Sequence, residues 1–282
     1  MKTFQRNIFA PLNDLQVLHI SHDLLSTYPR ESWSDFRNIT KVFSYGGPSN
    51  GSFAEIFSVM NSLKYLHSDI QIHVLRNCTF HAFGKTPLKY LEIKSKLMTI
   101  EKDTFSPLGF LSSLVIPNAR FLKLSNTLPA LHVFENRQMD ELNLNNNFRV
   151  HGEFIITSDL FAYIGNICVK KLSLTFNGIR MINADTIQKM NYKHCLESLN
   201  LKISKEFVNN DWAYYEATVG IEHFLGLQAR IIVINLENIT KTEIPQCVLQ
   251  MMSLDANDHI RKTDTLNENN IFWKCLDKAM KR

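Results

Sequence analysis

The sequence predicts an α/β fold of the repeating kind: a solenoid in which short parallel strands stack side by side, with loops and short helices behind them. Two observations predict it. The segment Phe9-Ala-Pro-Leu12-x-x-Leu15-x-x-Leu18-x-Ile20 returns as Phe105-Ser-Pro-Leu108-x-x-Leu111-x-x-Leu114-x-Ile116. Strand-like segments then recur about every 23 to 25 residues in the first half of the chain, and at wider intervals later. Repeats of this length must stack, because one repeat cannot bury its own apolar face.

The core of the repeat is L-x-x-L-x-L-x-x-N, and residues 169–177 carry its clearest copy. The alternating apolar pair is typical of a short strand with one buried face. An asparagine side chain after the strand can both donate and accept hydrogen bonds, so stacked copies satisfy backbone groups that point into the core. The copies over 139–147 and 249–257 carry the same residue. We therefore predict an asparagine ladder made of Asn147, Asn177 and Asn257.

The spacing also predicts the individual elements. A slipped copy is expected between Leu66 and Ile72, and the regular strands are expected to centre on Leu18, Val42, Leu91, Leu114, Leu142, Leu172, Leu199 and Ile234. Two wider intervals contain amphipathic segments, and we expect short helices there, over 158–164 and within 210–228. Buried aromatic residues on the convex side (Trp33, Phe80 and Phe105) are expected to line up as a spine.

This pattern resembles the leucine-rich repeat family over about residues 8–260. The segments Ile72–Phe80 and Leu97–Leu108 are similar to repeats in the ectodomain of a Toll-like receptor. The resemblance implies a curved horseshoe, with parallel strands on the concave face and loops and short helices on the convex face. It further implies one domain over 1–282, an extracellular or cell-surface location, and a protein or microbial ligand bound by a receptor dimer. Because neither end shows a cysteine-rich cap, we expect a receptor fragment that lacks both terminal caps.

Composition limits the other classes of function. Hydrophobic residues make up 45% of the chain, and the net charge of +4 comes from interspersed charges of both signs. We therefore expect no nucleic-acid partner. No apolar run reaches the length of a membrane-spanning helix, so we expect no span within this chain. The alternative function is an intracellular leucine-rich repeat adaptor or regulator in the cytoplasm, which acts through protein–protein binding.

The five cysteines give no metal or redox motif, because no two of them are spaced as C-x-x-C or C-x-C. Cys168 precedes a predicted strand, and Cys195 falls at the corresponding place one repeat later. We expect these two as small core residues, with a disulfide between them as the alternative.

The sequence has no H-E-x-x-H, no phosphate-binding glycine loop and no dinucleotide fingerprint. His19 and His22 have the side chains of metal ligands, but no carboxylate or cysteine motif accompanies them, so a solvent-exposed pair is expected. We expect no enzyme, no catalytic or metal-binding residue, and no cofactor.

The repeat locates the binding surface instead. Residues between and just after the buried strand positions face the concave wall, and that wall is expected to be polar and short of aromatic side chains apart from Phe176. The predicted positions on this wall are His19, Ser21, His22, Glu92, Lys94, Asn143, Asn145, Ser173, Thr175, Asn200 and Lys202. Four N-x-S/T tripeptides are acceptor sites for N-glycans if the chain enters the secretory route, at Asn38, Asn50, Asn77 and Asn238.

Overall fold

The computed structural model describes residues 9–46, 51–147, 154–175, 177, 179–182, 186, 190–203 and 231–236. Four predictions lie outside these residues: the helix within 210–228, the ladder residue Asn257, and the glycan acceptors Asn50 and Asn238. Phe176 lies outside them as well.

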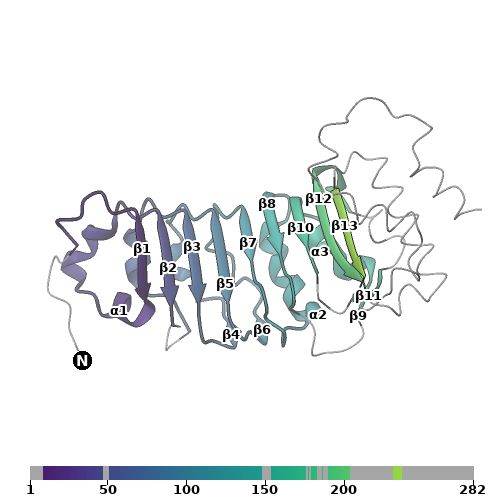
Figure 1. The fold of residues 1–282 in the computed structure, drawn as a ribbon, viewed down its shortest axis with the longest axis horizontal. Coiled ribbons are helices and arrows are strands. Elements are labelled where there is room, and N and C mark those ends of the chain that lie inside the picture. The colour runs from purple at the N-terminus through teal and green to yellow at the C-terminus, as the bar shows by residue number, and fades with distance from the viewer. Residues whose placement is uncertain are drawn as a thin grey trace, which may run out of the picture.

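The elements are short and alternate regularly along the chain (Figure 1). The strands are β1 (Val17–Ser21), β2 (Lys41–Tyr45), β3 (Tyr65–Asp69), β4 (Val74–Leu75), β5 (Tyr90–Lys94), β6 (Thr99–Ile100), β7 (Ser113–Val115), β8 (Gln138–Asn143), β9 (Phe154–Ile156), β10 (Cys168–Ser173), β11 (Ile179–Ile182), β12 (Ser198–Ile203) and β13 (Ile231–Leu236). The α-helices are α1 (His22–Thr27), α2 (Leu124–Thr127) and α3 (Ser158–Gly165). The 3-10 helices are η1 (Arg30–Phe36), η2 (Glu55–Val59), η3 (His81–Phe83), η4 (Leu128–Phe134) and η6 (Lys193–Cys195).

Within the described residues, nine strands form one parallel sheet in the order β1-β2-β3-β5-β7-β8-β10-β12-β13. Strands that are neighbours in space therefore follow one another along the chain (Figure 1). Two small parallel pairs, β4 with β6 and β9 with β11, accompany this sheet. The protein is thus α/β with an open parallel sheet, an arrangement compatible with a solenoid.

The strand register joins one residue of every rung into a single row. The row consists of Leu18, Val42, Leu66, Leu91, Leu114, Leu142, Leu172, Leu199 and Ile232. Leu66 lies in a regular strand, so the prediction of a slipped copy was wrong. The signature is hidden there because the second buried position of β3 is Ser68 instead of an apolar residue. Ile234 stands two residues beyond the aligned position of its strand.

Alternating burial explains why these segments form strands. In β2 the side chains of Val42 and Ser44 are buried, whereas Lys41 and Tyr45 are exposed. In β5 the buried pair is Leu91 and Ile93. A strand with one buried face alternates in this way, because successive side chains point to opposite sides. One face of the sheet therefore covers the core, and the other, hereafter the open face, carries the alternate side chains.

Aromatic rings form a stack inside the core. The ring centroids of Phe53 and Phe80 are 5.4 Å apart, those of Phe80 and Phe105 are 5.9 Å apart, and those of Phe105 and Phe134 are 5.8 Å apart. Phe80 and Phe105 thus occupy the predicted spine. Trp33 does not belong in it: this side chain is only partly buried, and its ring nitrogen donates to the Tyr28 carbonyl at 3.1 Å.

Helix α3 confirms the prediction of a short helix after β8. It begins where the Thr157 hydroxyl accepts a hydrogen bond from the Leu160 amide, at 3.4 Å. Such a cap satisfies one of the amides that a first helical turn leaves unpaired. Phe161 and Ile164 are buried against the core, as their spacing of three residues on one helix face requires.

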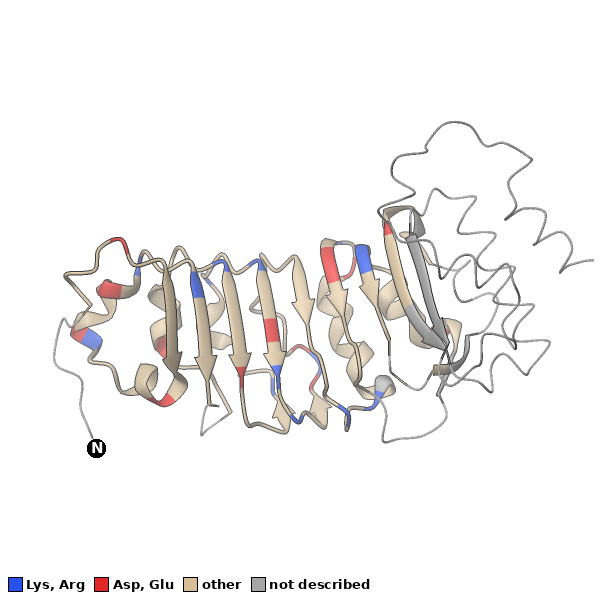
Figure 2. Cartoon of the chain, in the orientation of Figure 1, with Lys and Arg blue, Asp and Glu red and all other residues tan. Residues whose placement is uncertain are grey.

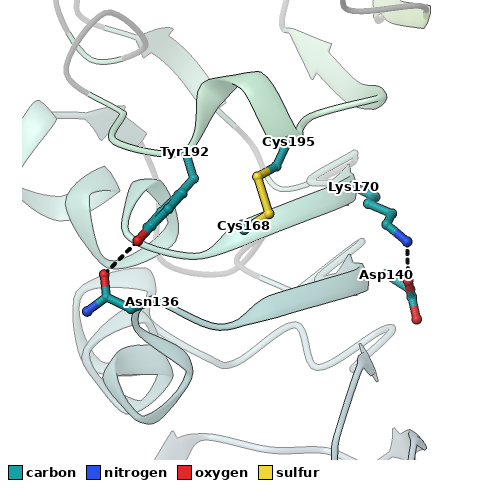
Figure 3. The surroundings of a disulfide bond; sticks show 6 residues. All are labelled: Asn136, Asp140, Cys168, Lys170, Tyr192 and Cys195. Atoms are coloured by element: carbon teal, nitrogen blue, oxygen red, sulfur yellow. Dashed lines mark hydrogen bonds and ion pairs between the residues drawn. A yellow bond between two sulfur atoms is a disulfide. The ribbon is translucent and has the colours of Figure 1, made fainter.

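A disulfide joins Cys168 and Cys195, so the expectation of two free core cysteines was wrong (Figure 3). The two Cα atoms are 5.3 Å apart, which lies within the range a disulfide needs. Their equivalent positions in successive repeats bring them close, since neighbouring rungs of a sheet lie about 4.8 Å apart. Both residues are half-buried and lie at the edge of the core.

Candidate binding face of the sheet

The open face divides into two regions of different chemistry. The aromatic region consists of outward side chains on β1, β2, β3 and β5: His19, Phe43, Tyr45, Tyr65, His67, Tyr90 and Glu92. The amide region consists of outward side chains on β8, β10 and β12 or two residues beyond β8 and β10, namely Asn143, Asn145, Ser173, Thr175 and Asn200. The prediction of a wall short of aromatic residues was wrong for the first region. The predicted wall included no residue of β2 or β3, the two strands whose second buried positions are serines.

Stacked rings cross the rungs of the aromatic region. His19 and Phe43 are parallel to within 8°, with centroids 4.3 Å apart. Tyr65 stacks on Tyr90 at 5.0 Å on one side, and the Lys41 ammonium lies 5.1 Å from its ring centre on the side of β2. The faces of Tyr65 are therefore occupied, although 45% of the residue is exposed. A partner meets the ring edge and the hydroxyl of this tyrosine.

Glu92 contacts several side chains of the open face. Its Oε2 atom lies 2.9 Å from His67 Nδ1 and accepts a hydrogen bond from the Tyr90 hydroxyl at 3.2 Å. Its Oε1 atom lies 3.4 Å from the Lys94 ammonium. The carboxylate thus contacts neighbours on its own strand and on β3, and it holds Tyr90 of the Tyr65–Tyr90 pair. Such contacts restrict the conformational freedom of the side chains on this face.

Two pKa shifts follow from this network. Burial favours a higher pKa for Glu92, but the hydrogen bond to His67 and the charges of His67 and Lys94 outweigh it and lower the pKa of this carboxyl. Burial, followed by the charge of Glu92 and the hydrogen bond to it, raises the pKa of Tyr90. At neutral pH, therefore, Glu92 is ionised and the Tyr90 hydroxyl keeps the proton that it donates.

The amide region is bonded mainly to itself. Asn145 Oδ1 accepts hydrogen bonds from the Ser173 hydroxyl at 2.9 Å and from the Thr175 amide at 2.8 Å. Asn143 donates from its amide to Glu141 at 3.4 Å and accepts from the Asn145 backbone amide at 3.3 Å. The side chains of Asn143, Asn145 and Ser173 therefore bond within the sheet, and the amide region presents little apolar surface.

Two predicted wall residues serve the fold instead. Ser21 ends β1, and its hydroxyl accepts a hydrogen bond from the Leu24 amide at 3.3 Å, which caps α1. His22 is only 3% exposed and packs against Phe53 and Phe57, so both its predicted place on the wall and the expectation of a solvent-exposed histidine pair were wrong. Burial lowers the pKa of His22, although Asp23 opposes this shift. The strand register places Lys202 on β12.

Behind the amide region, asparagine side chains bond successive turns. Asn177 Oδ1 accepts from the Asn147 backbone amide at 2.7 Å, and its Nδ2 donates to the Leu144 carbonyl at 2.8 Å. Asn147 bonds the preceding turn in the same way, through the Ile116 carbonyl at 2.5 Å and the Ala119 amide at 2.8 Å. Both asparagines are fully buried.

Behind the aromatic region, threonine side chains bond successive turns. The Thr79 hydroxyl bonds the Gly51 carbonyl at 2.9 Å, and the Thr104 hydroxyl bonds the Leu75 carbonyl at 3.2 Å. Both threonines are fully buried. Their recurrence before phenylalanine, in Thr79-Phe80 and Thr104-Phe105, is the sequence signal that could have identified this role.

Two glycan acceptors lie within the described residues, and both are exposed. The Asn38 side-chain amide donates to the Asn13 carbonyl at 3.0 Å. The Asn77 backbone amide donates to Glu101 at 3.2 Å, while the threonine of its tripeptide, Thr79, is buried. Asn38 thus precedes β2, and Asn77 lies in the turn between β4 and η3.

Across the part of the chain that the structure describes, no three His, Cys, Asp or Glu side chains gather as a metal site would require. Over the same residues, no helix has the length and apolar character needed to cross a bilayer. No model of a protein family matches this chain, and no curated protein matches it.

Proposed function

We propose that this chain is a recognition module of the leucine-rich repeat type, curved as a horseshoe, that binds a protein ligand through the aromatic region. One observation carries the proposal: four Phe or Tyr rings gather on one open sheet face, two of them, Tyr45 and Tyr65, 45% exposed. Protein interfaces concentrate binding energy in such rings, because they bury a large area at small entropic cost.

The surrounding contacts support this role. Rigid, pre-stacked side chains lose little conformational freedom when a partner binds. Glu92 holds Tyr90 and His67 in place, and Lys41 and Tyr90 sandwich Tyr65. Enzymatic function lacks comparable support, since His67, Glu92 and Lys94 are engaged in ion pairs, and His19 is engaged in a ring stack.

Within that class, the favoured protein is the ectodomain of a Toll-like innate immune receptor. The Cys168–Cys195 disulfide supports it, because such bonds persist in oxidising compartments. An intracellular adaptor is the second candidate, and the exposed free thiol of Cys78 favours it. Treatment of the native protein with an N-glycosidase separates the two, since a receptor ectodomain shifts in mobility and a cytoplasmic adaptor does not.

The binding proposal is tested by comparing matched variants of the full chain against an array of secreted and cell-surface proteins. The double variant Phe43→Ala with Tyr65→Ala is expected to weaken any specific binding at least about 30-fold, the effect of losing an interface hot spot. The matched control is Asn143→Ala with Ser173→Ala, which leaves the aromatic region intact. Ligands that depend on the control pair, and not on the rings, would overturn the proposal.

A further inference from the structure

Three lysines mark the edge of the open face where strands β2, β3 and β5 begin. The residue just before each of these strands is its entry residue, and its carbonyl accepts hydrogen bonds from two successive backbone amides of the next rung. Lys64 is the entry residue of β3, and Lys89 is the entry residue of β5. Lys41 stands one position later in the register, at the start of β2. Lys41, Lys64 and Lys89 are all exposed. We call these three residues the basic rim.

No acidic residue occupies the positions that correspond to the basic rim on β1, β2, β3, β5 and β7. The entry residues and first strand residues of β1, β2, β3, β5 and β7 are Gln16, Val17, Thr40, Lys41, Lys64, Tyr65, Lys89, Tyr90, Ser112 and Ser113, which include no Asp or Glu. The ion pairs between described residues include none of the three rim lysines. Figure 2 shows positive charge at the starting ends of β2, β3 and β5.

Further along the same edge, on β8 and β10, acidic and basic residues lie side by side. Within β8, Asp140 and Glu141 stand at the register of Ser112 and Ser113, and the Lys170 ammonium lies 2.8 Å from Asp140 Oδ1 (Figure 3). Lys89 is near enough to Asp140 to help lower the pKa of that carboxyl, although hydrogen bonds to Lys170 and Ser112 contribute more. The charge of Lys170 is therefore paired locally, whereas the ion pairs between described residues include no lysine of the basic rim.

We propose that the basic rim binds an extended acidic segment of a protein ligand, while the neighbouring tyrosines contact apolar side chains of the same segment; this inference rests on the proposed function. Adjacent rungs lie about 4.8 Å apart, so the lysines of three consecutive rungs present ammonium groups over about 10 Å. Acidic side chains on one side of an extended segment repeat about every 7 Å. Such a segment running across the rungs can reach all three lysines.

The aromatic region also favours a negatively charged ligand. Because Lys41 and Tyr90 occupy the faces of Tyr65, a ligand meets the ring edge, which carries partial positive charge. Ring edges and phenolic hydroxyls suit carboxylate and carbonyl oxygens. Glu92 does not oppose an acidic ligand strongly, since His67 and Lys94 pair with it.

The test measures binding of a labelled synthetic peptide, in which glutamate alternates with phenylalanine, to the full chain by fluorescence anisotropy. A second peptide replaces every glutamate with glutamine. The acidic peptide is expected to bind the wild type more tightly, and to lose affinity as salt rises. Replacing all three rim lysines by glutamine is expected to reduce that affinity about tenfold or more, since each exposed ion pair contributes a factor of about two to five and the three factors multiply.

Lys170→Gln with Lys171→Gln is the matched control, because these lysines lie within β10 beside Asp140 and Glu141. Less than about a twofold change in affinity is expected. Equal binding of the two peptides, or an unchanged affinity in the triple variant, would overturn the inference. A heparin fragment forms a separate arm. If it binds as tightly as the peptide and Tyr65→Ala affects neither, the rim attracts polyanions generally and the inference fails. The proposed function survives these failures wherever an array ligand still depends on Phe43 and Tyr65.

Discussion

The first four rungs of the sheet and the later rungs share one strand register but differ on both sides of it. On the open face, β1, β2, β3 and β5 carry stacked rings and histidines, whereas the rungs of β8 and β10 carry amides and hydroxyls bonded to one another. Inside, Thr79 and Thr104 bond the turns of the first part, and Asn147 and Asn177 bond those of the second. Uninterrupted strand pairing therefore does not require one repeating sequence signature.

The largest difference is expected in the core. Phe105→Ala removes a fully buried ring between Phe80 and Phe134, and it is expected to lower the free energy of unfolding by about 3–5 kcal/mol. Leu172→Ala, its counterpart in the later rungs, is expected to cost about 2–4 kcal/mol. Denaturant unfolding monitored by circular dichroism measures both. A larger loss for Leu172→Ala would mean that the ring stack is not the stronger part of the core.

The disulfide gives the later rungs a covalent link. It closes 27 residues, and replacing Cys168 and Cys195 by alanine is expected to cost about 3 kcal/mol, because the unfolded chain regains freedom. Hydrogen exchange locates the effect: amides of β10 and β12 are expected to exchange faster, while those of β2 and β3 stay protected. Uniform loss of protection along the sheet would show that the two parts unfold as one unit.

The interior bonds allow a third comparison. Asn147→Ala leaves the Ala119 amide and the Ile116 carbonyl without their side-chain partner, and it is expected to cost about 2–3 kcal/mol. Thr104→Val removes a single hydroxyl and keeps the shape, so about 1 kcal/mol is expected. Both values come from thermal or urea unfolding. Equal costs would indicate that threonine and asparagine stabilise the turns to the same extent.

The same contrast explains what could be predicted from the sequence. Where leucine, leucine and asparagine all occupy their positions, as over 169–177, the motif gives the strand and its buried residues directly. Ser44 and Ser68 break the motif without breaking the strand, because backbone pairing with β1 and β5 fixes the register. The aromatic region was missed for this reason. The disulfide was only an alternative, since equal spacing brings two cysteines together without saying whether they are oxidised.

Acid is expected to affect the two parts of the molecule unequally, through Glu92. The pKa of this carboxyl is lowered in the folded protein, so its stabilising contribution is complete above its ordinary value of 4.5 and is lost as the pH falls below that. Glu92→Gln is therefore expected to lose less stability than the wild type between neutral pH and pH values below 4.5. Urea unfolding across this range measures the difference. His67→Gln, which removes the partner, should reproduce it, and parallel curves for wild type and variants would contradict it.

The smallest expected effect concerns His22, which lies in the core at the first rung and has a buried Nδ1 atom without a hydrogen-bond partner. Burial lowers its pKa in the folded protein, so only the unfolded chain binds the proton just below the ordinary value of 6.5. Stability then falls as the pH drops through this window, by the linkage between folding and proton binding. His22→Phe keeps an aromatic ring against Phe53 and Phe57 and is expected to remove that dependence. The exposed His19, replaced by Phe, serves as the control and should leave the dependence in place. Melting temperatures compared at pH values on either side of 6.5 test this, and a dependence that survives in His22→Phe would assign it to other histidines.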